Sequence, residues 1–415
     1  MAVMKPFIGI RPNKGKAAMI AALPYDVYNR EEATKVVAAQ PESFLGIDRA
    51  ETNFPKDVDT YDECVYAKAK ELLWTRIEKG DFIREDKPCY YIYELTMNGR
   101  VQTGIVACAS IDDYRNNVIK KHENTREEKE IDRIKHVDTC NAQTGPIFLA
   151  YRSNISINEV ICAVKREQEA EYDFTSEDGI RHRVFVIDDQ EKVDFIKKAF
   201  DAINEIYIAD GHHRCASAVK VGMKRRAEHP NYTGEEEFNY FLSVLFQDHE
   251  LYIMDYNRVL KDLNGLNTEQ FLNEVSKRFD VTELGEEQDR HPEKKGTFTM
   301  YMDGKWYACQ VRKTDIPTDP VKSLDVSLLQ DLLLDPVLGI KDPKTDSRID
   351  FVGGIRGLEE LERRCGLDCK VAFAMYPTSI GELFDVADAG LLMPPKSTWF
   401  EPKLRSGLFI HEIEA

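Results

Sequence analysis

The stretch Ile208-Ala209-Asp210-Gly211-His212-His213-Arg214 marks a change from strand to helix. The residues Glu205-Ile206-Tyr207-Ile208 predict a short buried strand, and the helix-forming residues after Arg214 continue to a basic end at Lys224-Arg225-Arg226. Gly211 lets the backbone turn tightly at the junction and leaves the first amides of the helix unpaired. Because a helix N-terminus favours an anion, we predict a phosphate site here.

Four side chains with acid, base or charge chemistry crowd into this loop. Asp210 is an oxygen ligand suited to Mg²⁺, directly or through water. We expect His213, Arg214 and the amides of Gly211 and His212 to hold phosphates, with the His212 ring available for proton transfer. The ordinary alternative is a capped turn with solvated side chains. A second alternative, metal binding by the two histidines, lacks a Cys or His pair at ligand spacing nearby.

The sequence His122-Glu123-Asn124-Thr125 precedes a charged helix that we expect to end near Cys140. In the functional interpretation Glu123 is a general base that His122 holds or tunes, and Asn124 and Thr125 contact the nucleotide. In the alternative, Asn124 or Thr125 caps the helix and Glu123 lies beside its positive end. Since both loops open helices, we expect them to converge on one cleft.

A third segment, Met393 to Gly407, has prolines that fix an extended path. Lys396, Ser397 and Thr398 supply one cation and two hydroxyls, and with Arg405 they are candidate contacts to a substrate carboxylate or a phosphate. A packed loop with solvated charges is the alternative. Two further segments are weaker evidence for a functional site: Pro24-Tyr25-Asp26-Val27 and Gly353-Gly354-Ile355-Arg356-Gly357.

Turn signals predict an α+β fold with mixed sheets. Hairpins are expected at Asn98-Gly99, Asp178-Gly179 and Asp303-Gly304. Asn29 and Glu32 form a capping-box pattern. Two further segments, Tyr240 to Phe246 and Leu251 to Asp255, are expected to be adjacent strands.

The chain has 415 residues and a formal net charge of −17. This charge argues against unaided binding to nucleic acid or to an anionic membrane surface. The N-terminus lacks an apolar signal core, and no apolar run approaches membrane-spanning length. The nine scattered cysteines indicate reduced thiols and a cytoplasmic location.

Together, the loops at His122-Glu123 and Asp210 to Arg214 and the segment around Lys396 resemble a family of bacterial and archaeal proteins of unknown function related to the ParB/sulfiredoxin fold. Free-serine kinases, the nearest activity in that superfamily, carry a His-Glu motif and an Asp-Gly-x-His-Arg loop. The resemblance implies that Glu123 is the base for the serine hydroxyl and that the Asp210 loop cradles the nucleotide phosphates.

The chain also departs from these relatives. His212 stands where sulfiredoxins carry their reactive cysteine, and no ParB-type helix-turn-helix is found. The gap between the two loops is longer than in small serine kinases. The resemblance implies a ParB/sulfiredoxin-like nucleotide-binding core over 105–260, between α+β regions at 1–104 and 261–415.

These observations predict a phosphotransferase that uses ATP or ADP with Mg²⁺ and acts on a small hydroxylated metabolite, with L-serine/O-phosphoserine favoured. One alternative is a nucleotide-binding regulatory protein, a ParB-like switch without turnover. Another is a phosphatase of phosphorylated metabolites. The expected partners are therefore a small-molecule substrate and a nucleotide, and a homo-oligomer is left open.

Overall fold

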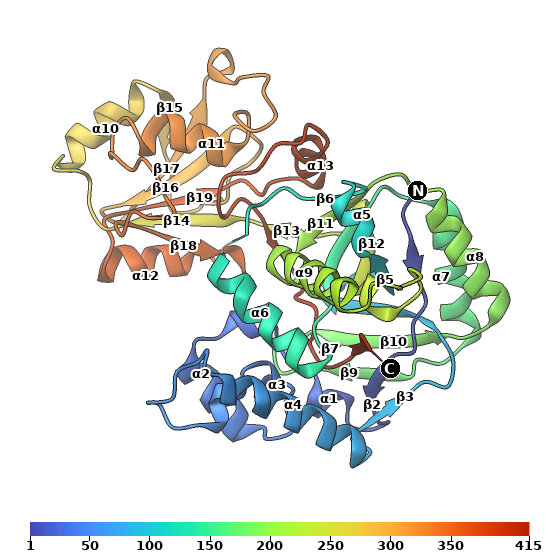
Figure 1. Ribbon diagram of the computed structural model, residues 1–415. Coiled ribbons are helices and arrows are strands. Elements are labelled where there is room, and N and C mark those ends of the chain that lie inside the picture. Colours follow the sequence, from blue (N-terminus) through green and yellow to red (C-terminus); the bar gives the residue numbers. More distant parts are fainter. Residues whose placement is uncertain (126, 415) are drawn as a thin grey trace. The chain divides into compact units, whose positions relative to one another are not determined.

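The computed structural model describes residues 1–125 and 127–414 (Figure 1). Two compact units divide the chain: Met1–Leu251 with Pro402–Ala415, and Tyr252–Glu401. Each unit is described by itself. The division into regions 1–104, 105–260 and 261–415 stays a prediction.

The first unit is built on a nine-stranded sheet with the order β6-β11-β8-β12-β5-β4-β10-β9, in which β1 also pairs with β5. The β6–β11 and β8–β12 pairs are parallel, and the other pairs are antiparallel. The sheet is therefore mixed, as the sequence predicted. Its strands are β1 (Met4–Lys5), β4 (Tyr90–Met97), β5 (Arg100–Ser110), β6 (Ile119–Lys120), β8 (Ile147–Tyr151), β9 (Tyr172–Thr175), β10 (Arg181–Ile187), β11 (Ile206–Asp210) and β12 (Tyr240–Gln247).

Apolar side chains of four helices, α5, α7, α8 and α9, share one core with this sheet. Ile157, Ile196 and Val219 represent α7, α8 and α9 in a cluster that includes Ile105 and Leu245 of the strands. The N-terminal helices form a second cluster that also contains the last residue of α6. The helices are α1 (Ala17–Ile20), α2 (Arg30–Ala39), α3 (Leu45–Asp48), α4 (Glu63–Glu78), α5 (Ile111–Arg115), α6 (Glu127–Cys140), α7 (Ile155–Glu167), α8 (Gln190–Asp201) and α9 (His212–Glu228).

Smaller elements complete the first unit. The 3-10 turns η1 (Tyr25–Val27) and η2 (Ala50–Asn53) flank α2 and α3, and η3 (Glu237–Asn239) precedes β12. Two further pairs are β2 (Ile10–Pro12) with β3 (Phe82–Arg84) and β7 (Ala142–Gln143) with β21 (His411–Glu412).

Local sequence signals in this unit are confirmed. The Asn29 side chain accepts from the Glu32 amide and the Glu32 side chain accepts from the Asn29 amide, which is the predicted capping box. Asn98 and Gly99 both have positive φ and join β4 to β5 in a tight hairpin. The hairpin around Asp178-Gly179 joins β9 to β10.

The second unit contains a six-stranded antiparallel sheet with the order β15-β17-β16-β19-β14-β18. The predicted Asp303-Gly304 hairpin joins β16 to β17. Its strands are β14 (Tyr256–Leu260), β15 (Phe279–Glu283), β16 (Thr297–Met302), β17 (Lys305–Val311), β18 (Ile349–Gly353) and β19 (Val371–Met375), and its α-helices are α10 (Thr268–Ser276), α11 (Asp325–Leu329), α12 (Glu359–Leu367) and α13 (Ile380–Asp388).

One strand pairing was predicted wrongly. The segment after Leu251 contains β13 (Ile253–Met254), which pairs with β20 (Trp399–Phe400) and not with β12. Both edges of β12 are already occupied by β5 and β8, so no hydrogen-bonding edge remains for a neighbour in sequence. The 3-10 turn Asp248–Glu250 leads the chain away instead.

The α+β class is confirmed, and the sheet of the first unit is mixed, whereas the ParB/sulfiredoxin-like core stays a prediction. Within residues 1–125 and 127–414, no helix is both long and apolar enough to cross a bilayer.

Candidate functional site

Two adjacent parallel strands bring the predicted loops together. Strands β6 and β11 pair in parallel, with Ile119 opposite Ile206 and Lys120 opposite Tyr207. His122 comes shortly after β6, and Gly211 follows β11 directly. Because both strands end at the same edge of the sheet, both loops lie at that edge (Figure 1). The carboxyl ends of parallel strands are where open α/β sheets bind ligands.

Gly211 makes the sharp entry into α9. It is the N-cap residue, in the left-handed region at φ 91° and ψ 32°. A Cβ at this position would lie 3.0 Å from Nη2 of Arg214, but the positive φ is the feature that requires glycine here. No side chain caps the helix. The first amides of α9 therefore remain available to an anion, as predicted.

Two buried imidazoles stand between the loops. The rings of His122 and His212 meet edge to face with centroids 4.5 Å apart. Nδ1 of His212 lies 4.0 Å from Oε2 of Glu123, whose side chain is 45% exposed. Nδ1 of His122 and Nε2 of His212 are buried and have no hydrogen-bond partner among the described residues. An unsatisfied buried polar atom costs about 1–3 kcal/mol, so these nitrogens are candidates to contact a ligand.

Burial keeps both imidazoles neutral at physiological pH. It lowers the pKa of His122 to about 4, against the opposing effects of the Asp210 charge and a hydrogen bond with the Ile208 backbone. Burial, followed by the nearby His122, places the pKa of His212 well below its usual range. A neutral imidazole can donate one hydrogen bond and accept another without adding charge to the site.

The Asp210 carboxylate lies near two cationic side chains and accepts a hydrogen bond from the N-cap residue of α9. Its Oδ2 lies 3.0 Å from Nζ of Lys403, and its Oδ1 accepts from the Gly211 amide at 2.8 Å. Burial acts to raise the pKa of Asp210, but the charges of Lys403 and Arg214 outweigh it and hold that pKa below its usual range. Asp210 is therefore ionised at neutral pH.

Arg214 is half-buried and contacts the backbone just before β8. Its Nη1 donates to the carbonyl of Pro146 at 2.6 Å, and its guanidinium lies against Gly211. Lys403 was not selected from the sequence, although it lies within the Met393 to Gly407 segment. In the sequence, Lys403 is only one more cation in a charged loop. It gains its partner, Asp210, because the C-terminal segment returns to the first unit.

Thr125 has a structural partner. Its hydroxyl donates to the carboxylate of Glu130, which also pairs with Lys220 of α9. Ser217 donates to the Glu130 carbonyl at 3.2 Å and to the His213 carbonyl at 2.7 Å. These bonds tie α6 to α9 behind the two loops. Asn124 is exposed, and its predicted contact with nucleotide stays a prediction, as do those of Thr125 and His213.

The cap of α6 adjoins Arg126, which lies outside the described residues. The structure therefore leaves open whether Asn124 or Thr125 caps this helix.

The remaining predicted residues have contacts of their own. Lys396, Ser397 and Thr398 belong to the second unit, where the Lys396 and Ser397 carbonyls accept from Arg258 and Thr378 at 3.0 and 2.9 Å. Their substrate role stays a prediction.

Arg405 is in the first unit and is 3% exposed. It forms an ion pair with Asp178 and donates to Ser176 Oγ at 3.1 Å. These contacts anchor the C-terminal segment to the β9–β10 hairpin, and the predicted substrate contact of Arg405 stays a prediction.

Among the described residues, no group of three or more His, Cys, Asp or Glu side chains is arranged to hold a metal ion. Asp210 could supply one carboxylate oxygen, since its other oxygen already faces Lys403. This arrangement suits a Mg²⁺ ion that brings most of its ligands as water and phosphate oxygens.

Comparisons with solved structures find distant likenesses. A free serine kinase in complex with AMP is 14% identical, over 72% of this chain and 86% of that chain, with a TM-score of 0.34. A conserved hypothetical protein from Pyrococcus furiosus is 14% identical over 74% and 94%, with a TM-score of 0.34. SbnI from Staphylococcus aureus, with a C-terminal truncation, is 12% identical over 71% and 82%, with a TM-score of 0.37. Likenesses this distant do not assign an activity to this chain.

No curated protein matches the sequence. A sequence profile does match it, over residues 4–327, and its description is "Protein of unknown function (DUF1015)". The match spans the first unit up to Leu251 and continues into the second. The chain therefore belongs to the DUF1015 family of proteins of unknown function.

Proposed function

We propose that this protein is a nucleotide-dependent phosphotransferase that moves a phosphoryl group from ATP or ADP to a small hydroxylated metabolite, with L-serine favoured as the acceptor. The observation that supports this most directly is the convergence of the two loops. Nδ1 of His212, in the first turn of α9, lies 4.0 Å from the carboxylate of Glu123. A helix N-terminus for phosphate and a carboxylate for a hydroxyl proton therefore share one edge of the sheet.

Each part of this edge has a role in phosphoryl transfer, which depends on positioning and charge neutralisation. The α9 amides beside Gly211 and the guanidinium of Arg214 would hold the donor phosphates. Glu123 would accept the hydroxyl proton as the acceptor oxygen bonds to phosphorus and the bond from phosphorus to the leaving nucleotide oxygen breaks. His122 and His212, neutral and unsatisfied, would hydrogen-bond the phosphate or orient Glu123.

Mg²⁺ forms part of the proposal. Asp210 would hold the ion, directly or through water, because its carboxylate stays ionised between Lys403 and Arg214. The ion would supply neutralisation of phosphate charge. The proposal also includes a ParB/sulfiredoxin-like core over 105–260, the part of the chain that carries both loops.

The test is to incubate the purified protein with L-serine, Mg²⁺ and either ATP or ADP and to measure O-phosphoserine by mass spectrometry. We expect product with the native protein and with Glu128→Gln, and none with Glu123→Gln. Glu128 is a matched control because it is an exposed glutamate that follows the same loop. Nucleotide binding without product would favour the regulatory switch, and phosphate release from O-phosphoserine without nucleotide would favour the phosphatase.

A further inference from the structure

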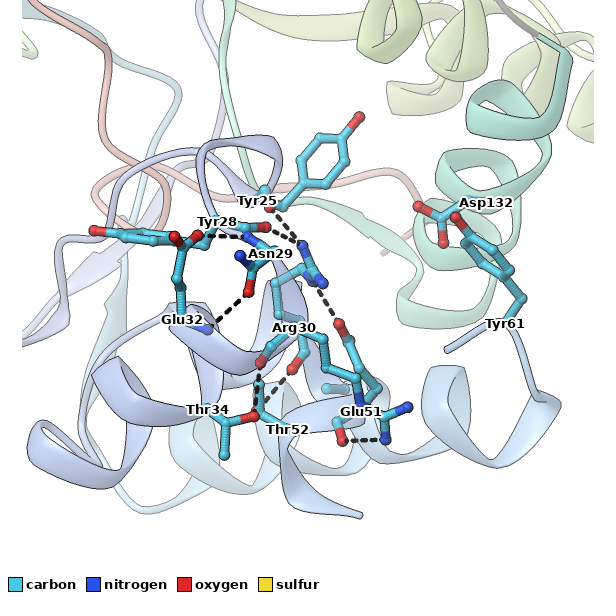
Figure 2. Close-up of polar contacts among 12 residues, drawn as sticks. Tyr25, Tyr28, Asn29, Arg30, Glu32, Thr34, Glu51, Thr52, Tyr61 and Asp132 are labelled. Atoms are coloured by element: carbon cyan, nitrogen blue, oxygen red, sulfur yellow. Dashed lines mark hydrogen bonds and ion pairs between the residues drawn. The ribbon is translucent and has the colours of Figure 1, made fainter. Parts of the chain in front are cut away.

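A cavity of about 200 Å³ lies in the first unit where η1, η2, α4 and α6 meet. Its wall includes Tyr25, Tyr61 and Asp132, which Figure 2 shows beside the polar network of the N-terminal helices. A volume of about 200 Å³ has room for a molecule of the size of a small amino acid. The nucleotide loops described above do not account for this cavity.

Hydrogen bonds to backbone carbonyls fix the wall formed by the N-terminal turns. Arg49 donates from Nη1 to the carbonyls of Tyr25 and Tyr28 at 3.0 and 2.7 Å, and its Nε pairs with Glu51. Arg30 reaches the Pro55 carbonyl at 2.9 Å. These bonds hold η1 and η2 in place, so the cavity has a preformed shape.

The buried charges of α6 neutralise one another. The guanidinium of Arg133 lies 4.0 Å from the ring centre of Tyr25 and pairs with Asp132 at 2.8 Å. Asp132 also accepts from the hydroxyl of Tyr66 at 3.0 Å. This part of the wall therefore offers aromatic faces and satisfied polar groups, and it demands no net charge from a ligand.

Two charged groups of the wall have no partner within residues 1–125 and 127–414. The carboxylate of Asp26 and the ammonium of Lys129 both line the cavity from solvent-exposed positions at its rim, and neither forms a hydrogen bond or ion pair there. The other charged groups of the cavity have polar partners. The remaining anion and cation match a ligand that carries both a positive and a negative charge. A zwitterionic amino acid has this property and fits the volume.

The cavity adjoins the loop that would hold phosphate. A second cavity, of about 30 Å³, shares Tyr25 and Arg133 with the first and is lined on its other side by Arg214 and Gly145. Burial raises the pKa of Tyr25 to about 12, and the charges of Arg133 and Arg214 oppose that rise, so Tyr25 lies within the field of both guanidinium groups. A ligand in the larger cavity would therefore sit on the Arg214 side of the phosphate loop.

We infer that this cavity is the acceptor site, and that it binds a small hydroxylated α-amino acid with its ammonium at Asp26 and its carboxylate at Lys129. The inference rests on the proposed phosphotransferase function for its role, but binding itself can be measured without nucleotide. It assigns a use to the Pro24-Tyr25-Asp26-Val27 string, which the phosphate loops leave unexplained.

The test is calorimetric titration of the purified protein, without nucleotide, with L-serine, L-threonine and L-homoserine. Two truncated probes accompany L-serine: 2-aminoethanol, which lacks the carboxylate, and glycerate, which lacks the ammonium. We expect Asp26→Asn to weaken L-serine and 2-aminoethanol by roughly tenfold or more and to leave glycerate unchanged. Lys129→Met should weaken L-serine and glycerate and leave 2-aminoethanol unchanged.

Lys56→Met and Asp57→Asn are matched controls, because both side chains are exposed and neither lines the cavity. Failure of all three amino acids to bind, or binding of L-serine that is unaltered in both cavity variants, would overturn the inference.

The acceptor site and the phosphotransferase can fail separately. L-serine binding with the expected variant pattern but without O-phosphoserine would leave the cavity assignment standing and remove the phosphotransferase. O-phosphoserine formation with the same KM for serine in the native protein and both cavity variants would do the reverse.

Discussion

Nζ of Lys403 lies 3.0 Å from Oδ2 of Asp210, so the C-terminal segment places a cation at the strand end that opens into α9. The pair is partly solvent-accessible, with side chains 17% and 36% exposed. An ion pair of this exposure contributes only about 1 kcal/mol to stability. Its larger effect in the proposed mechanism is electrostatic, because without Lys403 the Asp210 carboxylate would repel an incoming phosphate.

We therefore predict that Lys403→Met weakens ADP binding by about tenfold while the protein stays folded. Calorimetric titration with ADP and Mg²⁺ measures the affinity. Lys16→Met is the control, since Lys16 forms a comparable half-buried ion pair with Asp81 away from the site. Equal ADP affinities for the native protein and Lys403→Met would exclude this role for Lys403.

Glu123→Gln should reduce turnover by at least about 100-fold, because a glutamine cannot accept the hydroxyl proton. Its side chain is 45% exposed, so the free energy of unfolding should change by less than about 0.5 kcal/mol. Single-turnover assays and urea unfolding measure the two effects. Retained turnover in Glu123→Gln, with Glu128→Gln as reference, would rule out general-base catalysis by this residue.

Acid should destabilise the protein partly through His122. Burial lowers the pKa of this residue from 6.5 to about 4 in the folded state, so the unfolded chain binds a proton first as pH falls. Stability from this group is intact above pH 6.5 and is lost as pH falls from 6.5 to 4, by up to about 3 kcal/mol.

Urea unfolding of the native protein and of His122→Leu at about pH 7.5 and about pH 4.5 isolates this contribution. The variant should lose less stability between the two pH values than the native protein. If the two proteins lose the same amount, the low pKa is not coupled to folding.

Gly211→Ala should lower both stability and phosphate binding. A non-glycine residue at φ 91° costs about 1–2 kcal/mol, and the new methyl group would meet Arg214 at 3.0 Å. Gly179→Ala is a matched control, because Gly179 has φ 79° and open space where an added Cβ would lie. Thermal unfolding should show a loss in both variants, whereas ADP affinity should fall only in Gly211→Ala. A fall in both would point to general destabilisation.

Much of what was predicted correctly depends on residues that are close together in the sequence. The Asp210 loop was placed correctly at a strand-to-helix junction because Gly211, the apolar strand before it and the basic helix end after it are all short-range features. The capping box at Asn29 and the hairpin at Asn98-Gly99 are equally local. Each depends on residues within a few positions of one another.

Long-range pairings were less accessible. Strand β6 has only two residues, Ile119 and Lys120, so no periodicity in the sequence indicates its parallel pairing with β11. We expected the two loops to converge because both open helices. We did not predict the pairing of β6 with β11 that brings them together. The partner of Lys403 and the occupied edges of β12 likewise depend on segments far apart in the chain.

The first unit consists of two separate stretches of the chain, and this has a consequence for fragments of the protein. The polypeptide leaves the first unit at Leu251 and returns to it at Pro402, so residues 252–401 interrupt that unit in sequence. A product that terminates between Leu251 and Pro402 would keep both histidines and Glu123 but would lack the ammonium group facing Asp210 and the strand that pairs with β7. The phosphate-binding loop therefore gains its Lys403 contact only after the ribosome has released the whole of the second unit.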